Sequence, residues 1–282
     1  MLVTEQAHAK INLALHVTGR REDGYHELDS IVAFAAVADV LTMAPADSVT
    51  LDMTGPFAGA LPRDGTNSVL SAWRLLDGFS RQRGAPLTPV KFKLEKNLPV
   101  ASGIGGGSAD AAAALRGLVR LFDISVSEPD LHELALQLGA DGPICLLQKS
   151  SRMRGIGEII EPLAPELPPA IVLVNPRIPA PTSKVFEFLN LQCGQSFGAG
   201  IGNLYDFQSW RNDLTAPAVT LVPEITDVIG SLIFQPETIC SRMSGSGATC
   251  FGLFESLETA QIAADAIAEK HPNWWVVATT LL

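Results

Sequence analysis

Residues 98–114 read LPVASGIGGGSADAAAA, and this stretch decides how the rest of the chain is interpreted. Four glycines and two serines run directly into an alanine-rich segment with strong helix propensity. Glycine lets the backbone turn sharply and approach a ligand without a Cβ, and the start of a helix offers unpaired N–H groups and a positive dipole end. The stretch therefore predicts an anion site, typically for phosphate. The plainer alternative is a flexible loop with Ser108 as helix N-cap.

The loop is not one of the two common nucleotide-binding fingerprints. A Walker A loop requires a lysine after its last glycine, and none follows here. The dinucleotide fingerprint G-x-G-x-x-G requires glycine at Ser108 and a strand leading straight into the loop, where Pro99 instead weakens a strand. A phosphate-binding loop of a third kind is the interpretation that remains.

Composition limits the class of protein. The 282 residues, 47% hydrophobic and 18% charged, suit one large or two ordinary globular domains. A formal net charge of -10 argues against general nucleic-acid binding, which needs an excess of Lys and Arg. No basic start with an apolar run suggests a signal peptide, and no apolar run is long enough to cross a membrane. We expect neither a nucleic-acid nor a membrane partner.

The cysteines predict a reducing, cytoplasmic location. Cys145, Cys193, Cys240 and Cys250 show no C-x-x-C spacing, which argues against a zinc site or a dithiol redox site.

Hydrophobic periodicity predicts an α+β protein, because strands and helices alternate irregularly. Helices are expected at residues 68–79, 108–122, 128–138 and 257–269, and strands at 6–17, 28–42, 49–53, 90–96, 170–174, 248–254 and 274–279. Loops are expected at 18–24, 64–67, 192–202 and 243–247, with a Pro-rich connector at 161–169. We expect two lobes, 1–155 and 156–282, divided shortly before the change in composition at the connector.

Several segments, in one order along nearly the whole chain, resemble the GHMP small-molecule kinases. They are AKINL at 9–13, DGYHEL at 23–28, the glycine loop at 99–112, LGADGP at 138–143, MRGIGE at 153–158 and MSGSGATCF at 243–251. One such glycine loop is weak evidence, whereas the ordered set is specific.

The resemblance implies a two-lobed fold, with the ATP loop in the N-terminal lobe and a ferredoxin-like C-terminal lobe. It implies transfer of the γ-phosphate of ATP to a hydroxyl of a small-molecule cytidyl diphosphate substrate. Mg²⁺ is expected with ATP, ligated mostly by phosphate oxygens and water, with no metal site of protein carboxylates. The oligomeric state stays open.

The resemblance also implies roles for individual residues. Asp141 is the candidate base or orienter of the acceptor hydroxyl and Lys10 is its cationic partner, although GADGP at 139–143 alone is more typical of a turn. An exposed strand lysine is the alternative for Lys10, which its apolar neighbours disfavour. The expected ATP-binding residues are Asn67, Lys96, Pro99, Val100, Ala101, Ser102, Gly103, Ile104, Gly105, Gly106, Gly107, Ser108 and Ala109. The expected substrate-binding residues are Asn12, Tyr25, His26, Phe186, Ser246 and Gly247.

One position departs from the family pattern, and other functions stay open. The family usually has Val where Gly142 stands, so glycine is expected to loosen the aim of Asp141. The alternatives are a kinase for another alcohol such as mevalonate or homoserine, a diphosphomevalonate decarboxylase, and a non-enzymatic nucleotide sensor. The DGYH run disfavours the first, and Lys10 with Asp141 disfavours the sensor.

Overall fold

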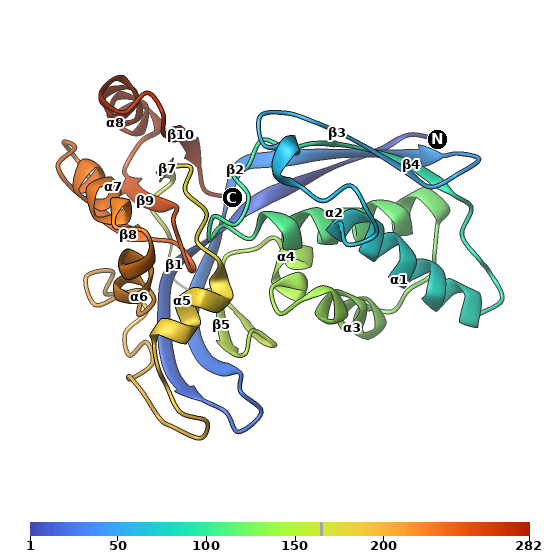
Figure 1. Ribbon diagram of the computed structural model, residues 1–282, viewed down its shortest axis with the longest axis horizontal. Coiled ribbons are helices and arrows are strands. Elements are labelled where there is room, and N and C mark those ends of the chain that lie inside the picture. Colours follow the sequence, from blue (N-terminus) through green and yellow to red (C-terminus); the bar gives the residue numbers. More distant parts are fainter. Residues whose placement is uncertain (164–165) are drawn as a thin grey trace. The chain divides into compact units, whose positions relative to one another are not determined.

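Two long strands, β1 (Val3–Arg20) and β2 (His26–Pro45), pair with each other and run through two compact units. The computed structural model describes residues 1–163 and 166–282 (Figure 1). The first unit comprises Met1–Ala9, Ala38–Val100 and Gly105–Gln148, and the second comprises Lys10–Val37, Ala101–Ile104 and Lys149–Leu282. The boundary predicted between residues 155 and 156 separates the two lobes of the family fold, which are not the same as these two units. That boundary stays a prediction.

In the first unit, a small sheet is covered by helices. β4 (Val90–Glu95) is antiparallel to β2 and parallel to β3 (Thr50–Thr54). Alternate residues of β4 are buried, as the period-2 pattern of its sequence predicts. Figure 1 shows the four helices of this unit on the same side of these strands. They are α1 (Ser68–Gln82), α2 (Gly106–Phe122), α3 (Glu128–Leu138) and α4 (Gly142–Leu147), and a short turn, η1 (Ala58–Ala60), precedes them.

Helix α2 begins two residues earlier than the sequence predicts. Gly105, with φ +65, is its N-cap, so Ser108 lies inside the first turn, and the plainer alternative, with Ser108 as N-cap, is wrong. The left-handed conformation of Gly105 turns the chain straight into the helix. The alanine run that follows is buried, because its small side chains allow α1 and α4 to pack closely on α2.

The second unit contains a ferredoxin-like sheet. Its four antiparallel strands lie in the order β10-β7-β9-β8, with β7 at Ala170–Asn175, β8 at Cys240–Met243, β9 at Cys250–Phe254 and β10 at Trp275–Thr280. The helices are α5 (Thr182–Phe188), α6 (Thr215–Leu221), α7 (Glu224–Ile233) and α8 (Leu257–Lys270). With α7 between β7 and β8 and α8 between β9 and β10, this is the βαββαβ arrangement. The expected fold class is therefore confirmed.

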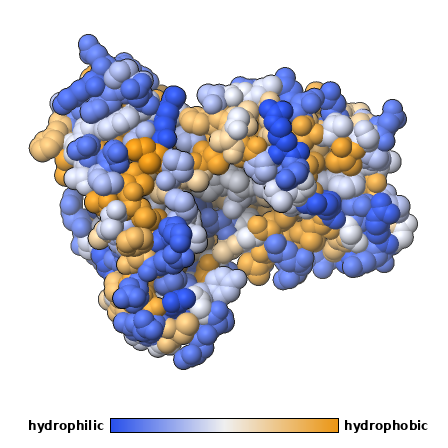
Figure 2. All heavy atoms as spheres, in the orientation of Figure 1, coloured by the Kyte–Doolittle hydropathy of each residue, from blue (hydrophilic) through white to orange (hydrophobic). Residues whose placement is uncertain are grey.

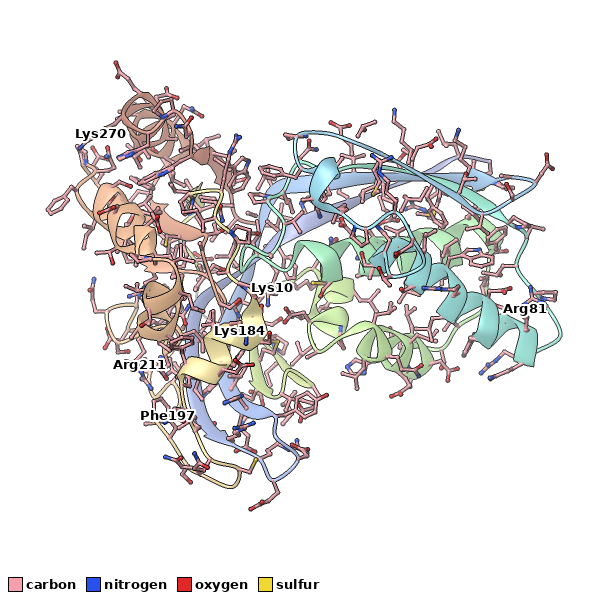
Figure 3. The ribbon with its side chains drawn as sticks, in the orientation of Figure 1. Lys10, Arg81, Lys184, Phe197, Arg211 and Lys270 are labelled. Atoms are coloured by element: carbon pink, nitrogen blue, oxygen red, sulfur yellow. The ribbon has the colours of Figure 1, made fainter. Side chains whose placement is uncertain are left out.

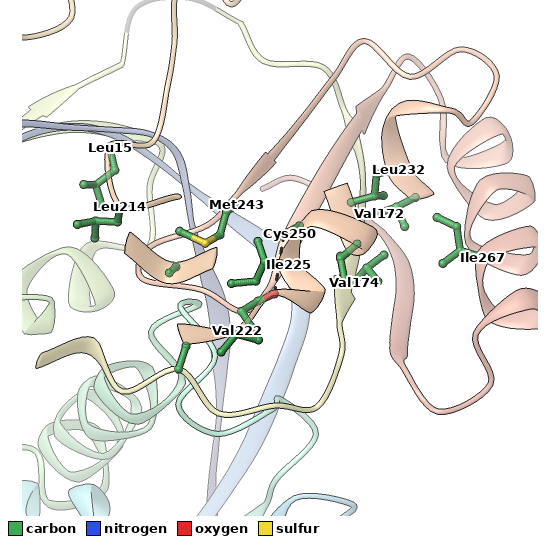
Figure 4. Close-up of a cluster of buried hydrophobic side chains, with 14 of the residues drawn as sticks. Leu15, Val172, Val174, Leu214, Val222, Ile225, Leu232, Met243, Cys250 and Ile267 are labelled. Carbon is green, nitrogen blue, oxygen red and sulfur yellow. Dashed lines mark hydrogen bonds between the residues drawn. The ribbon is translucent and has the colours of Figure 1, made fainter. Parts of the chain in front are cut away.

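The core of the second unit lies between this sheet and its helices (Figure 4). Every residue of β7 is buried, as expected for a strand in the middle of a covered sheet. Helix α8 buries Ala260, Ala263, Ala264 and Ile267, one face of an amphipathic helix. The face of α8 opposite to these buried residues lies at the surface, which is mainly hydrophilic there in Figure 2.

Several short elements differ from the sequence expectations. β1 continues to Arg20, so the loop expected from Thr18 begins only at Arg21. β5 (Ser151–Gly155) pairs with β2 and with β6 (Ile159–Pro162), and β6 enters the stretch expected as a connector, whose residues 164–165 lie outside the described residues. The sequence also gave no indication of α4, α5, α6, α7 or β8. No helix of the described residues has both the length and the apolar character to span a membrane.

Candidate active site

The middle of the glycine loop is held by the second unit at every residue from Ala101 to Ile104. Each carbonyl accepts one hydrogen bond, from a strand, a loop or a side chain. The bonds are Lys10 N–H to Ile104 O at 3.0 Å, Ser244 Oγ to Gly103 O at 2.9 Å, Thr249 N–H to Ser102 O at 3.1 Å and Ala180 N–H to Ala101 O at 3.2 Å. The structure thus brings together three motifs that lie far apart in the sequence.

Gly103 is required for packing between the two glycine loops. Its φ is +77, and a Cβ there would lie 2.6 Å from the backbone nitrogen of Gly247 and clash with the carbonyl oxygen of Ser244. Real Cβ atoms do not approach backbone this closely. The role of Gly103 is therefore to let the second loop approach the first.

Asn12 and Lys10 lie on β1 beside these loops. The Asn12 amide N–H donates to Ser244 Oγ at 3.0 Å, and its Nδ2 donates to Ser30 Oγ at 2.8 Å. The Oδ1 of Asn12 is buried and accepts no hydrogen bond from the described residues, so it is available to a ligand hydroxyl. Lys10, labelled in Figure 3, is only 5% exposed, which excludes the exposed strand lysine considered above.

The sequence analysis missed Asn212, which fixes the second glycine loop. Its Nδ2 donates to the carbonyls of Met243 and Gly245, both at 2.8 Å, and its Oδ1 accepts from the Leu214 amide at 2.9 Å. Nothing in the spacing of the residues around Asn212 signals this role. Its two partners in the second glycine loop are more than 30 residues away in sequence.

The first unit supplies the other end of the glycine loop, from Gly105 into α2. Gly107 is exposed in the first turn, and a Cβ at this position would meet no atom within 4 Å. Because the first amides of a helix have no intrahelical partner, the open space at Gly107 adjoins unpaired donors. This is a cradle suited to an anion.

Asp141 is placed by the close packing of three helices. It is the N-cap of α4, which packs against α2 and α3, and its side chain makes no capping hydrogen bond. Asp141 belongs to the first unit and Lys10 to the second, so their pairing stays a prediction.

Two of the expected ATP-binding residues, Asn67 and Lys96, already have partners in the first unit. Asn67 caps α1 by accepting from the Val69 amide at 3.0 Å and donates to the Pro62 carbonyl at 3.0 Å. Lys96 is 1% exposed, and its ammonium group is 2.5 Å from Asp39 and 2.6 Å from Asp110. Contact of either residue with ATP stays a prediction.

His26 and Phe186, which lie far apart in the sequence, meet in the second unit. Their ring centroids are 4.7 Å apart at an interplanar angle of 31°, and Phe186 comes from α5. The Nε2 of His26 is buried and has no hydrogen-bond partner among the described residues. Burial and, next, the neighbouring Arg20 lower the pKa of His26, which keeps the ring neutral near pH 7. Tyr25, directly before it, is 59% exposed.

Two family models match the chain in the order of the two lobes. GHMP kinases N terminal domain matches residues 67–149, and GHMP kinases C terminal matches residues 186–273. The chain belongs to the GHMP kinase family. Both models cover parts of the site described above, since the first includes the glycine loop and Asp141 and the second includes Phe186 and the second glycine loop.

Several curated relatives of this GHMP kinase share a name. Proteins named 4-diphosphocytidyl-2-C-methyl-D-erythritol kinase from Paramagnetospirillum magneticum and from Rhizobium leguminosarum are 45% and 50% identical to it, over 98% of this chain and 98% and 94% of theirs. A crystal structure of 4-(cytidine 5'-diphospho)-2C-methyl-D-erythritol kinase matches with a TM-score of 0.80 and 35% identity, over 99% of this chain and 98% of that chain. Homoserine kinase from Cytophaga hutchinsonii, with a TM-score of 0.71 at 16% identity over 99% of this chain and 95% of that chain, shares the fold.

In this GHMP kinase, Gly142 is tightly packed. It is buried at the start of α4, where a Cβ would lie 2.7 Å from the carbonyl carbon of Ala135 on α3 and would clash with its oxygen. The valine that the resemblance leads us to expect at this position does not fit this backbone. Glycine here lets α4, and with it Asp141, approach α3 closely.

We therefore expect Gly142→Val to lower the free energy of unfolding by about 1–3 kcal/mol, the usual cost of overpacking. Urea unfolding followed by circular dichroism measures the change. Gly78→Val is the matched control, because a Cβ at Gly78, on α1 of the same unit, meets nothing within 4 Å. Equal stability of the two variants would contradict the close packing of α4 on α3.

Proposed function

We propose that this enzyme transfers the γ-phosphate of ATP to the 2-hydroxyl of 4-diphosphocytidyl-2-C-methyl-D-erythritol, in non-mevalonate isoprenoid precursor synthesis. The observation that carries the choice of acceptor is the pairing of His26 with Phe186. It supports the substrate that the relatives' names indicate.

The cytosine ring of the substrate would be bound by stacking and by one edge contact. Phe186 and the exposed Tyr25 offer aromatic faces, and every base has a π-face on which such rings stack. The Nε2 of the neutral His26 would hydrogen-bond the edge of the base. This buried nitrogen would thereby gain the hydrogen-bond partner that it lacks among the described residues. Mevalonate and homoserine offer neither a ring to stack nor such an edge.

The phosphates of ATP would lie at the N-terminal end of α2, over Gly105 to Ala109. Gly107 leaves the space, and the first amides of the helix donate to the phosphate oxygens. Ser108, in the same turn, would bind a phosphate oxygen or Mg²⁺. Mg²⁺, when bound with ATP, neutralises charge on the phosphate oxygens.

In the reaction, the oxygen of the 2-hydroxyl forms a bond to the γ-phosphorus while the bond from that phosphorus to ADP breaks. The hydroxyl proton passes to the carboxylate of Asp141, which also orients the hydroxyl. Lys10 stabilises the negative charge that develops on the transferred group. The Oδ1 of Asn12 accepts from a substrate hydroxyl, and Ser246 and Gly247 close the acceptor side.

We place the enzyme in the cytoplasm. None of its four cysteines is in a disulfide, as is usual for proteins in a reducing compartment.

An ADP-release assay tests the choice of acceptor. The protein is supplied with Mg·ATP and, in turn, the cytidyl substrate, mevalonate and homoserine, and kcat/KM is compared among the three. We expect turnover with the cytidyl substrate alone. Comparable kcat/KM for mevalonate or homoserine would assign the chain to another reaction within the same fold.

Tyr25→Ala is expected to raise KM for the cytidyl substrate about tenfold, because base–aromatic stacking contributes about 1–3 kcal/mol. KM for ATP should not change. The exposed ring contributes little to folding, and Tyr205→Ala, which removes another exposed ring of the second unit (68%), is the matched control. If KM for both substrates rises together in Tyr25→Ala, the ring does not bind cytosine.

A further inference from the structure

A buried group of three charged side chains lies beneath the start of α2 in the first unit. Lys96 Nζ is 2.5 Å from Asp39 Oδ2 and 2.6 Å from Asp110 Oδ2, and all three side chains are at most 1% exposed. Asp39 is on β2, Lys96 directly follows β4, and Asp110 is on α2. We call these three residues the buried charge cluster.

The cluster holds both ends of the glycine loop. On the entry side, Asp39 Oδ1 accepts from the backbone N–H groups of Asn97 and Leu98, at 2.6 and 2.9 Å. On the exit side, Asp110 is four residues after Gly106, on the same face of α2. A Cβ on Gly106 would lie 3.2 Å from Lys96 Nζ, so the ammonium group lies directly beside the first residue of the helix.

We propose that the buried charge cluster positions the glycine loop for ATP, and that ionisation of Asp110 weakens ATP binding. The proposal rests on the proposed function, since it takes the glycine loop as the site of the ATP phosphates. Asp39, Lys96 and Asp110 act here as positioning residues, because they act through the loop.

The charge of the cluster depends on one proton. With both carboxylates ionised its net charge would be -1, buried beside a site for phosphate anions. Asp110 Oδ1 is buried without a partner among the described residues, an arrangement that favours the neutral carboxyl. Burial raises the pKa of Asp110 to about 7, against the lowering effect of Lys96 and with a further increase from Asp39. The cluster is thus neutral below about pH 7 and negative above it.

Other titratable side chains on the surrounding elements have partners of their own or are exposed. On α1, Asp77 is paired with Arg81, and Glu5 on β1 is paired with Arg116 and Arg120 of α2. On α3, Asp130 is paired with Arg83, while Glu128, His132 and Glu133 are exposed. Cys145 is on α4. The groups that act on the pKa of Asp110 are therefore those of the cluster, Lys96 and Asp39.

Asp110→Asn tests the proposal, because asparagine has the shape of the neutral carboxyl and cannot ionise. Binding of a non-hydrolysable Mg·ATP analogue is measured by calorimetry at about pH 6 and about pH 8, on either side of the raised pKa of Asp110. The ratio of the affinities of variant and parent at each pH cancels the titration of the analogue itself. We expect similar affinities at the lower pH and an affinity of the variant about tenfold higher at the upper pH, the usual size of coupling between two groups.

Two further variants complete the experiment. Asp52→Asn changes an exposed carboxylate that pairs with Lys91 at 3.1 Å in the same unit, and it should follow the parent at both pH values. Asp39→Asn removes one negative charge from the cluster, so it should also remove the pH dependence, although its single amide oxygen cannot accept from Lys96 as well as from Asn97 and Leu98. Asp39→Asn replaces Asp110→Asn in the experiment if Asp110→Asn does not fold.

A merely structural cluster gives a different result. If the ratio of variant to parent affinity is the same at both pH values, the proposal is overturned, whatever the stability of the variants. In that case the parent still binds the analogue and the proposed function stands. If the parent does not bind the analogue, the proposed function fails first, and the proposal fails with it.

Discussion

Asp141→Asn is expected to lower kcat by about 10²–10⁴-fold, the usual contribution of a group that accepts or orients a proton in the transition state. The amide has the shape of the carboxylate but cannot take the hydroxyl proton. Binding of Mg·ATP should be nearly unchanged, because the carboxylate acts on the acceptor. Steady-state kinetics with saturating substrates measure kcat, and calorimetry with a non-hydrolysable analogue measures the binding.

The structure makes this substitution a clean test. The side chain of Asp141 makes no capping bond to α4, and asparagine is as good an N-cap as aspartate, so the helix should keep its stability. Asp130→Asn, which neutralises a partly exposed carboxylate of the same unit paired with Arg83 at 3.5 Å, controls for the loss of charge alone. A variant at Asp141 that retains more than a tenth of the parent rate would show that the carboxylate is not the proton acceptor.

The glycine loop shows what local sequence predicts and where it fails. The helix after the loop was predicted from its alanines, and α2 confirms it. Its start was placed too late, because serine is a common N-cap and the sequence does not show that Gly105 adopts a left-handed φ of +65. The sequence also does not distinguish Gly103, which packs against another loop, from Gly107, which faces open space.

The buried charge cluster was missed although one signal of it was present. Residues Val90, Phe92 and Leu94 form the buried face of β4, and Lys96 continues that alternation by one more step. Period-2 patterning therefore places Lys96 on the inside. Its partners, Asp39 and Asp110, come from segments 57 and 14 residues away, and no local rule identifies them.

The substrate side of the site depended on family resemblance. His26 and Phe186 are 160 residues apart, and no periodicity relates them. The resemblance predicted that both bind the substrate, and the fold does bring their rings together. Asn212 had no such guide, so its hold on the second glycine loop is visible only in the structure.

Gly107→Val is expected to abolish binding of Mg·ATP while the protein remains folded. A Cβ at Gly107 meets no atom within 4 Å, and valine is no worse than glycine inside a helix, so the melting temperature without ligand should not fall. The branched side chain would occupy the space that the phosphates need beside the first amides of α2. This position is a better test than Gly106, where a Cβ would press on Lys96 Nζ at 3.2 Å and disturb the buried charge cluster.

Thermal melts with and without Mg·ATP measure the effect. Ligand at about 100 times Kd stabilises a native protein by about 2.7 kcal/mol, which should raise the melting temperature of the parent by about 5 °C. Gly78→Val makes the same substitution where there is equally open space on α1, and it should keep the full increase. Gly107→Val should show an increase below about 1 °C on the same scale. If Mg·ATP stabilises Gly107→Val as fully as it stabilises the parent, the phosphates bind elsewhere and the anion site assigned to this loop is wrong.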